Sequence, residues 1–517
     1  MLAATAAWAA LSLALPAGAG QLGFDSGNLG VAYTEQDSAW DVYFAVKFSN
    51  PMDAVPLVIN AVEIFGGHPD LAGDLDVYVW DSDYDGKPGY ETIVLYDQVL
   101  DPAQTWNRYE VREQASQEHI MPGCSIYAGF GLLEPTPCGA PYDDQTPGAG
   151  RSWWNHPYET WDWEQGGPAV AGGANLMVRL DVTPVNTWKG QTGDWLDPTQ
   201  WWYGLPAAEQ EVTVGGSGTA QVTTGEAEAA RVILTCDLDH TGGTLAVGEE
   251  LYVGYWTHSG AYTLSSGTLA VRDLYLGPYN YGTLTLAGDA EIYVSGKLHL
   301  GYRARLFVAG GTVHMTGAAL ENRCTDATAV PGLAALTVIF EGGAGQVDPV
   351  EVAGQDLGAA PAGWTANFAL GTLQLGGADA GRIRLIDDYQ NQPDWVQAEA
   401  LYVEGLVLNA GAAIDLNGLN LYYRNGGDPK QLFRGDATLD GQVNYLDVGI
   451  VATNYGSAAL TWAGGDFTGD QIVNYLDVGI LATNYGNGGG SGGQVPEPAA
   501  IVLLVPMALT LLARRRR

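Results

Sequence analysis

Apolar and polar residues alternate with a period of two in several short segments of the first third of the chain. Successive side chains of a β-strand point to opposite faces, so this pattern predicts strands with one buried face. Turn-rich sequence separates the segments, which is typical of a β-sandwich or jelly roll. We therefore predict a mainly β protein whose N-terminal domain, residues 21–184, is a β-sandwich or jelly roll. The alternating segments cover residues 40–48, 75–80 and 175–182.

The pattern changes at residue 186, where short apolar segments recur with glycines between them. Segments of the form Leu-x-Leu/Val-Gly begin at Leu251, Leu274 and Leu298, with steps of 23 and 24 residues. Such a step is the length of one coil of a parallel β-solenoid, whose inward Leu and Val side chains stack from coil to coil. We predict a β-solenoid, or β-helix, over residues 186–423. Related Gly-Thr segments begin at Gly243, Gly267, Gly282 and Gly311.

A solenoid needs covered ends, because its terminal strands otherwise expose unpaired backbone groups. The tryptophan-rich segment 188–202 is the candidate cap at the entry, and residues 411–423 are the candidate at the exit. Residues 424–434, which contain Asn-Gly-Gly-Asp-Pro, are predicted to be a linker.

The most distinctive pattern is a duplication, since residues 443–456 recur as residues 473–486 with Val451 replaced by Leu481. Each copy belongs to a stretch whose side-chain oxygens have the spacing of an EF-hand loop. Such a loop wraps a hard cation, adds a backbone carbonyl at its seventh position and closes with an acid at its twelfth. We predict two Ca²⁺ sites, one per copy. The predicted ligands are Asp436, Thr438, Asp440, Gln442, Asn444 and Asp447 in the first loop, and Asp466, Thr468, Asp470, Ile472, Asn474 and Asp477 in the second.

Two further positions bear on these loops. Gly441 occupies the sixth position of the first loop, where the backbone needs a positive φ, whereas Gln471 occupies it in the second loop. A side chain at positive φ costs about 1 kcal/mol, so we expect the second loop to bind calcium more weakly. Val443 and Val473 fit the apolar position that would pair the two loops back to back.

Residues 435–486 resemble a type I dockerin module, in which two calcium loops are each followed by one helix. The resemblance implies a small α-helical calcium module that binds a cohesin-like or other docking protein. Thr438 and Thr468 replace the usual Asn or Asp at the third position, so a hydroxyl or a water serves there. The dipeptides Tyr445-Leu446 and Tyr475-Leu476 occupy the positions where dockerins carry partner-recognition residues. The alternative is that the ions only fold a small domain that lacks a core of its own.

The amino-acid composition of the chain excludes some classes of function. The chain has 517 residues, with 22 basic against 59 acidic residues and a net charge of −37. Nucleic acids need a basic surface, so we exclude them as partners, and the acidic balance favours calcium and an extracellular setting. Four cysteines do not make a disulfide scaffold in so long a chain. Cys124 and Cys138 could clip one loop, and Cys236 and Cys324 could pair or stay free.

Both ends carry export signals. Residues 1–19 are an apolar run that ends in an A-x-A cleavage pattern, which indicates a signal peptide. A Gly/Ser-rich linker, residues 487–494, precedes residues 495–517, which contain Val-Pro-Glu-Pro, an apolar segment and four arginines. The apolar segment predicts a transmembrane sorting helix whose arginines stay on the cytoplasmic side. The signal residues are Val495, Pro496, Glu497, Pro498, Arg514, Arg515, Arg516 and Arg517.

This three-part tail resembles the PEP-CTERM sorting signal of Gram-negative bacteria. The resemblance implies recognition by an exosortase-type sorting enzyme and processing during export. The protein would then associate with the inner membrane transiently and reach the outer surface or the extracellular matrix. A plain membrane anchor is the alternative.

A catalytic role has to be weighed, because β-helices include polysaccharide hydrolases and lyases. A hydrolase needs clustered carboxylates at defined separations. Asp237 and Asp239, beside His240, could share one strand face, whereas the neighbours Asp387 and Asp388 would point to opposite faces. We favour a solvated turn for the first cluster and assign no catalytic residue.

Two hypotheses remain. The favoured one is an exported, non-catalytic cell-surface or extracellular-matrix protein with a calcium-dependent docking module. The alternative is a secreted carbohydrate-active enzyme, a glycoside hydrolase or polysaccharide lyase of polysaccharide catabolism, tethered through its dockerin-like module. Polysaccharide is a further candidate partner. The aromatic residues between Trp153 and Trp163 could stack on sugar rings or belong to the core.

Overall fold

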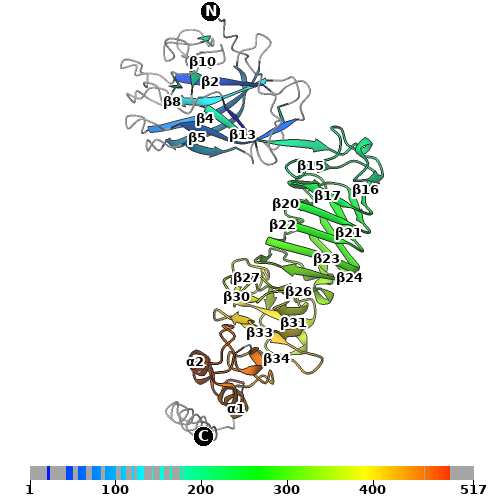
Figure 1. The fold of residues 1–517 in the computed structure, drawn as a ribbon, viewed down its shortest axis with the longest axis vertical. Coiled ribbons are helices and arrows are strands. Elements are labelled where there is room, and N and C mark those ends of the chain that lie inside the picture. Colours follow the sequence, from blue (N-terminus) through cyan, green and yellow to red (C-terminus); the bar gives the residue numbers. More distant parts are fainter. Residues whose placement is uncertain are drawn as a thin grey trace, which may run out of the picture. The chain divides into compact units, whose positions relative to one another are not determined.

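The computed structural model is mainly β and divides into two compact units (Figure 1). The first unit comprises Met1–Asn186 with Ala208–Glu211, and the second comprises Thr187–Ala207 with Val212–Arg517. The signal segment 1–19 and the sorting tail 495–517 lie outside the residues that the structure describes. Those residues are 20–23, 42–49, 56–65, 73–82, 88–100, 106–111, 119–120, 125–132, 142–143, 152–155, 164–165, 175–176, 178–458 and 460–488.

The first unit contains antiparallel sheets. One has the order β11-β10-β2-β8-β4-β5. In another, β3 pairs with β13, β6 and β7, and β1 pairs with β13. β9 and β12 form a separate pair. The bounds are β1 Gly20–Gly23, β2 Val42–Ser49, β3 Leu57–Phe65, β4 Gly73–Ser82, β5 Pro88–Leu100, β6 Trp106–Glu110, β7 His119–Ile120, β8 Ser125–Leu132, β9 Tyr142–Asp143, β10 Ser152–Asn155, β11 Glu164–Gln165, β12 Asn175–Leu176 and β13 Val178–Thr187.

The predicted alternating segments of this unit are strands. Residues 40–48 correspond to β2, residues 75–80 to β4, and residues 175–182 to β12 with the start of β13. Consecutive apolar side chains are buried in both β3 (Leu57, Val58 and Ile59) and β4 (Val77, Tyr78 and Val79), so both faces of these stretches are covered. Of the tryptophan-rich stretch 153–163, the structure describes only the backbone of residues 153–155 in β10. The side chains that could stack on sugar rings lie outside the described part of the chain.

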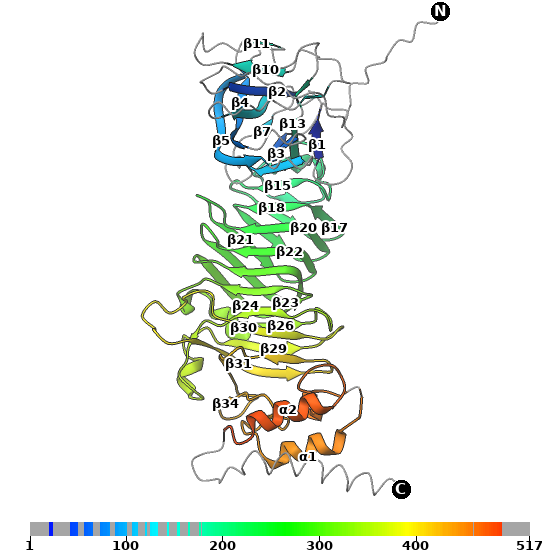
Figure 2. The same cartoon turned by 90° about the vertical axis from the view of Figure 1, so that its left-hand side faces the viewer.

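The second unit contains a parallel β-solenoid of about 10 turns. Its strands stack in parallel rows along the coils (Figure 2). One row runs through β16, β19, β21 and the starts of β23 and β24. These strands are β16 Thr219–Val222, β19 Asp237–His240, β21 Gly260–Leu264, β23 Gly282–Leu300 and β24 Ala304–Met315.

Two more rows complete each coil, because the long strands bend from one face into the next. The second row adds β17 Glu226–Ala229, β20 Thr244–Val253, β22 Thr268–Leu276, β26 Thr337–Phe340, β29 Leu370–Leu375 and β31 Glu399–Leu408. The third adds β18 Arg231–Leu234, β25 Ala319–Asn322, β27 Asp348–Glu351, β30 Arg382–Ile386 and β32 Ala413–Asp415. The remaining elements are β14 Gly193–Asp194, β15 Glu211–Val214, β28 Gly354–Gln355, η3 Pro198–Gln200, η4 Ala327–Ala329, η5 Pro331–Ala335 and η6 Pro361–Trp364.

The coil length predicted from sequence is confirmed. Leu251 of β20 pairs with Leu274 of β22, which pairs with Leu298 of β23. All three side chains are buried in one continuous core that fills the solenoid. Burial drives this register, because a shift by one residue would turn the leucines to solvent.

The entry of the solenoid is closed by three buried tryptophans. Trp201 packs edge-on against both Trp188 and Trp195, with ring centroids 5.0 and 4.8 Å away. Its indole N–H donates to the Trp195 carbonyl at 2.8 Å. Because these rings are almost fully buried and pack on one another, they cover the first coil as predicted.

The exit differs from the prediction. Residues 411–423 do not form a cap but continue the coils, because β32 pairs in parallel with β30 and β33 (Asn420–Tyr423) pairs in parallel with β31. Residues 424–434, expected as a linker, instead contain β34 (Lys430–Gln431), which pairs antiparallel with β33. Asn425 and Gly426 both have positive φ, at 49° and 74°, and belong to the loop of residues 424–429 that joins β33 to β34.

Two short helices follow the solenoid, α1 (Tyr445–Asn454) and α2 (Tyr475–Asn484), with η7 (Trp462–Gly464) between them. They belong to the same compact unit as the solenoid (Figure 2). None of the helices in the described ranges is long and apolar enough to cross a membrane. Cys236 and Cys324 are both buried and free, which settles their predicted alternatives in favour of thiols.

Two buried glutamates hold the side loop of the solenoid, residues 387–398, which joins β30 to β31. Glu351 accepts hydrogen bonds from the backbone N–H groups of Asp388 and Tyr389, and Glu399 accepts them from Asn391 and Gln392. Burial raises the pKa of both carboxyls to about 7. Their protonated forms are therefore favoured in the folded chain more than in the unfolded chain.

We predict that the stability of the solenoid falls as the pH rises from about 4.5, the ordinary glutamate pKa, to about 7. In that window the folded chain holds protons that the unfolded chain has already lost. Urea unfolding of the full chain in EDTA at several pH values measures the slope. Replacing both residues, Glu351→Gln with Glu399→Gln, should flatten it, whereas Asp289→Asn at an exposed site should not. An unchanged slope in the double variant would refute this origin.

Candidate metal centre

The start of each helix fixes the last two predicted ligands of each loop. Asn444 caps α1, since its side-chain oxygen accepts from the Leu446 N–H at 2.8 Å. The Asp447 carboxylate reaches back to the Asn444 N–H at 2.8 Å, which completes a capping box. Asn474 and Asp477 repeat this arrangement at the start of α2. The ninth and twelfth loop positions are therefore held by the helix start itself.

The twelfth-position acids also close the loops onto their own beginnings. Asp447 accepts hydrogen bonds from the N–H groups of Ala437 and Thr438 at 2.9 and 3.1 Å. Asp477 accepts from the N–H groups of Phe467 and Thr468 at 2.8 and 3.1 Å. Both carboxylates are buried. In each loop, backbone N–H groups therefore surround the carboxylate of the twelfth-position acid.

The first-position acids hold the middle of each loop. Asp436 accepts from the Gly441 N–H at 2.8 Å, and Asp466 accepts from the Gln471 N–H at the same distance. The threonine hydroxyls at the third position donate to these acids, at 3.1 Å for Thr438 and 3.2 Å for Thr468. The threonines thus lie at the loop centre, where their oxygens could face an ion.

The remaining predicted ligands lie on the more open side of the loops. The fifth-position acid accepts from the seventh-position N–H in both copies, Asp440 from Gln442 and Asp470 from Ile472, at 2.9 Å. In the second loop, the Asn474 amide N–H₂ also donates to Asp470 at 2.9 Å.

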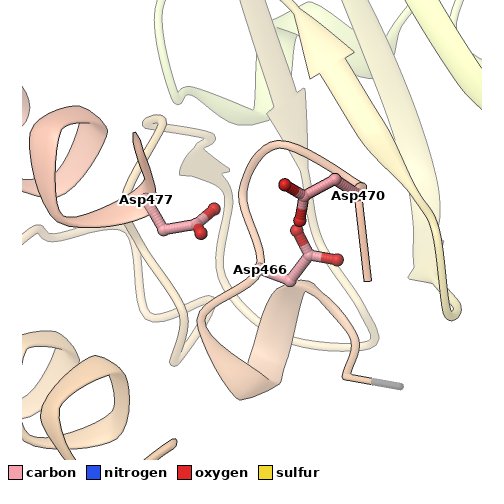
Figure 3. A group of neighbouring side chains, drawn as sticks. All are labelled: Asp466, Asp470 and Asp477. Carbon is pink, nitrogen blue, oxygen red and sulfur yellow. The ribbon is translucent and has the colours of Figure 1, made fainter. Parts of the chain in front are cut away.

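The three acids of the second loop converge. The carboxylate oxygens of Asp466, Asp470 and Asp477 lie within 4.8 Å of one another (Figure 3). Among the described residues, no other group of three or more aspartate, glutamate, histidine or cysteine side chains brings its ligand atoms this close together. The donors are all oxygens, which suit a hard cation such as Ca²⁺ rather than a soft transition metal. The residues present therefore fit the predicted ion.

The negative charge of the buried carboxylates also favours a bound cation. Asp436, Asp447, Asp466 and Asp477 are all buried, and in the described chain none of them forms an ion pair with a lysine, arginine or histidine. Burial raises the pKa of Asp436 to about 6 and that of Asp466 above its usual range. Burying several carboxylates without a counter-charge is costly, and a divalent cation would offset that cost.

Backbone strain is shared by the loops rather than confined to the second. Gln471 has a φ of 67°, as the sequence predicted, and Gly441 at the same position has 84°. At the fourth position, however, Leu439 has a φ of 53° where the second loop has Gly469. Each loop therefore carries one side chain in the left-handed region. The strain at Gln471, from which weaker calcium binding by the second loop is predicted, is therefore matched by strain at Leu439 in the first loop.

The two copies are tied together crosswise. The Gly486 N–H after α2 donates to the Val443 carbonyl, and the Gly456 N–H after α1 donates to the Val473 carbonyl, both at 2.8 Å. Val443 and Val473 are buried, but in the described chain their backbone hydrogen-bond partners follow the helix of the other copy rather than lying in the other loop. Each loop is thus closed by the segment that leaves the other copy's helix.

The second loop also contacts the last coils of the solenoid. Arg382 of β30 donates to the Gly469 carbonyl at 2.5 Å. A β-carbon on Gly469 would lie 2.8 Å from the Gly411 carbonyl oxygen and 2.9 Å from the Ala413 β-carbon. Trp462, fully buried between the copies, donates to the Asp436 carbonyl at 2.7 Å. The tandem of residues 435–486 and the solenoid share one core.

The candidate catalytic clusters do not assemble. Asp237–His240 is the strand β19 and not the solvated turn that the sequence favoured; Asp237 and Asp239 share its outward side, whereas His240 is buried and hydrogen-bonds the Tyr262 hydroxyl at 2.8 Å. Burial lowers the pKa of His240, which favours its neutral form. Asp387 and Asp388 follow β30 in the side loop. His240 therefore faces the opposite side of β19 from Asp237 and Asp239.

No protein-family model, no curated protein and no solved structure matches this chain.

Proposed function

We propose that this is an exported, non-catalytic protein of the cell surface or extracellular matrix whose C-terminal tandem loops bind two Ca²⁺ ions and dock a partner protein. Export rests on the sequence signals at residues 1–19 and 495–517, the latter for an exosortase-type enzyme. The N-terminal unit is proposed to be a β-sandwich. The tandem 435–486 is proposed to be a dockerin-like module.

The observation that carries the proposal is the set of buried carboxylates in the tandem. Asp436, Asp447, Asp466 and Asp477 are buried within rings of backbone N–H groups and, in the described chain, have no cationic side chain beside them. Calcium would bind between the first-, fifth- and twelfth-position acids of each loop and neutralise them. The ion would supply charge and order, not chemistry.

A docking role is supported by apolar residues that the fold leaves uncovered. Tyr445 and Leu446 open α1 with exposed fractions of 73% and 46%, and Tyr475 and Leu476 open α2 with 72% and 46%. Neighbouring residues of each helix, Val451 and Leu481, are buried instead. Exposed tyrosine and leucine at equivalent sites of both copies offer two equivalent contact surfaces for a partner.

The calcium loops would serve the solenoid as well as a partner. The second loop packs on the last coils through Gly469 and Arg382, so an ion that orders this loop also orders the solenoid exit. Folding and docking are therefore compatible roles of the same ions. The module is proposed to be both the cap of the last coil and the docking surface.

An immobilised type I cohesin tests the docking role. The full chain should bind it in calcium and dissociate in EDTA. Replacing both tyrosines, Tyr445→Ala with Tyr475→Ala, should weaken binding at least about 100-fold, because buried interface aromatics contribute about 2 kcal/mol or more. The matched control is Thr453→Ala with Thr483→Ala, which alters the same helices elsewhere. Binding that is unchanged in the tyrosine variant or in EDTA would refute the proposed surface.

A further inference from the structure

Exposed aromatic side chains gather at one corner of three successive coils. The corner follows Gly254, Gly277 and Gly301, the glycines that end the Leu-x-Leu/Val-Gly segments. The turns stack directly, since the Arg303 N–H donates to the Gly277 carbonyl and the Gly260 N–H donates to the Tyr281 carbonyl. The corner's exposed rings are Trp256, Tyr279, Tyr281 and Tyr302.

Two of these rings form a platform. Trp256 and Tyr279 stack with centroids 5.6 Å apart and an angle of 11° between the rings. Each is 51% exposed, so the stack does not bury them in the core. Tyr255 packs edge-on against Tyr279 at 5.4 Å and supports the platform from beside it.

The platform is held in place by its turns. The Asn280 side chain donates to the Trp256 carbonyl at 3.2 Å and accepts from the Tyr281 N–H at 2.8 Å. Trp256 has a φ of 45°, in the left-handed region that bulky residues rarely adopt. A strained, exposed tryptophan fixed by its neighbours is typical of a binding position.

Positive charge lies beside the platform. Arg303 and Arg305 stand over the Tyr281 ring, with guanidinium carbons 5.0 and 4.3 Å from its centroid. Both are exposed, and in the described chain neither forms an ion pair. In a protein with 59 acidic and 22 basic residues, two unpaired arginines at one corner favour an anionic ligand.

We propose that this corner binds an acidic polysaccharide built of uronic acid units. The faces of Trp256 and Tyr279 that do not stack on each other match the C–H faces of sugar rings, and the arginine forks match carboxylates. Asn280 and Ser259 supply polar groups next to the platform. The site lies on coils remote in sequence from the calcium loops and does not rest on calcium binding.

Titration of the full chain with oligogalacturonate, followed by calorimetry and tryptophan fluorescence, tests the site. EDTA is present throughout, because calcium cross-links uronates and would confuse the two proposals. Trp256→Ala and Tyr279→Ala should each weaken binding at least 10-fold. Arg303→Gln with Arg305→Gln should weaken it similarly and reduce its salt dependence. Trp202→Ala is the matched control, since Trp202 is also exposed beside a cation, Lys189, but stacks on no other ring among the described residues.

The ligand arms decide the chemistry. A neutral cello-oligosaccharide should bind at least 10-fold more weakly than the oligogalacturonate. Equal binding of the neutral oligomer, or tighter binding of a dextran sulfate oligomer, would overturn the assignment to uronates. No binding of any of the three, or wild-type affinity in Trp256→Ala, would overturn the site. Circular dichroism confirms that each variant is folded, and Tyr279→Ala provides a second test if Trp256→Ala is not.

Discussion

Removing calcium is expected to lower the melting temperature of the full chain by about 8 °C. At a free calcium concentration about 100 times the dissociation constant, each site adds about 2.7 kcal/mol to the stability of the folded state. For a unit of about 300 residues, 1 kcal/mol corresponds to about 1.5 °C. Differential scanning calorimetry in calcium and in EDTA measures the shift. Because the loops share a core with the solenoid, the solenoid transition itself should move.

The paired variant Asp447→Asn with Asp477→Asn removes the twelfth-position charge from both loops. It keeps an oxygen for the N–H groups of Ala437 and Phe467 but loses the acceptor for the N–H groups of Asn444 and Asn474, so the comparison is made within the variant. Its melting temperature should be nearly the same in calcium and in EDTA. Asp428→Asn removes one such charge at an exposed site just before the module and should respond to calcium like the wild type. Equal melting of the wild type in calcium and in EDTA would count against both ion sites.

The second large effect is expected from Gly469→Ala. Its backbone has a φ of 69°, and the new methyl group would lie 2.8 Å from the Gly411 carbonyl oxygen. The left-handed conformation costs about 1–2 kcal/mol, and the overlap with the last coil costs about 1–3 kcal/mol more. Calorimetry should show a solenoid transition that is lower and that responds less to calcium than the wild-type transition does.

Gly479→Ala in α2 is the control for that substitution. A β-carbon there meets nothing within 4 Å, and alanine favours the helix by about 1 kcal/mol, so the variant should be slightly more stable. Opposite signs for two Gly→Ala changes ten residues apart would support the contact between the second loop and the coils. If Gly469→Ala melted like the wild type, the proposal that the module caps the solenoid would be wrong.

The solenoid could be predicted because its signal is local and repeated. Leu251, Leu274 and Leu298 must face the core on every coil, so their spacing reports the coil length directly. The helix starts were predictable for a similar reason, since Asn444 and Asp447 form a capping box from residues three apart.

What the sequence did not reveal depends on contacts between distant segments. Nothing near Gly469 indicates that it meets Gly411, and a single sequence does not show which side of a loop is covered. The strain at Leu439 was missed because only the sixth loop position was considered, although Gly469 marks the fourth position in the other copy. Residues 424–434 have no alternating pattern and predict a linker, whereas Lys430 and Gln431 pair with β33.

Calcium titration of the metal-free full chain by isothermal calorimetry tests the central proposal most directly. The account predicts binding of two ions per chain, and loss of that heat in the Asp447→Asn, Asp477→Asn variant. Absence of heat in the wild type, together with no calcium found by elemental analysis after dialysis, would contradict it.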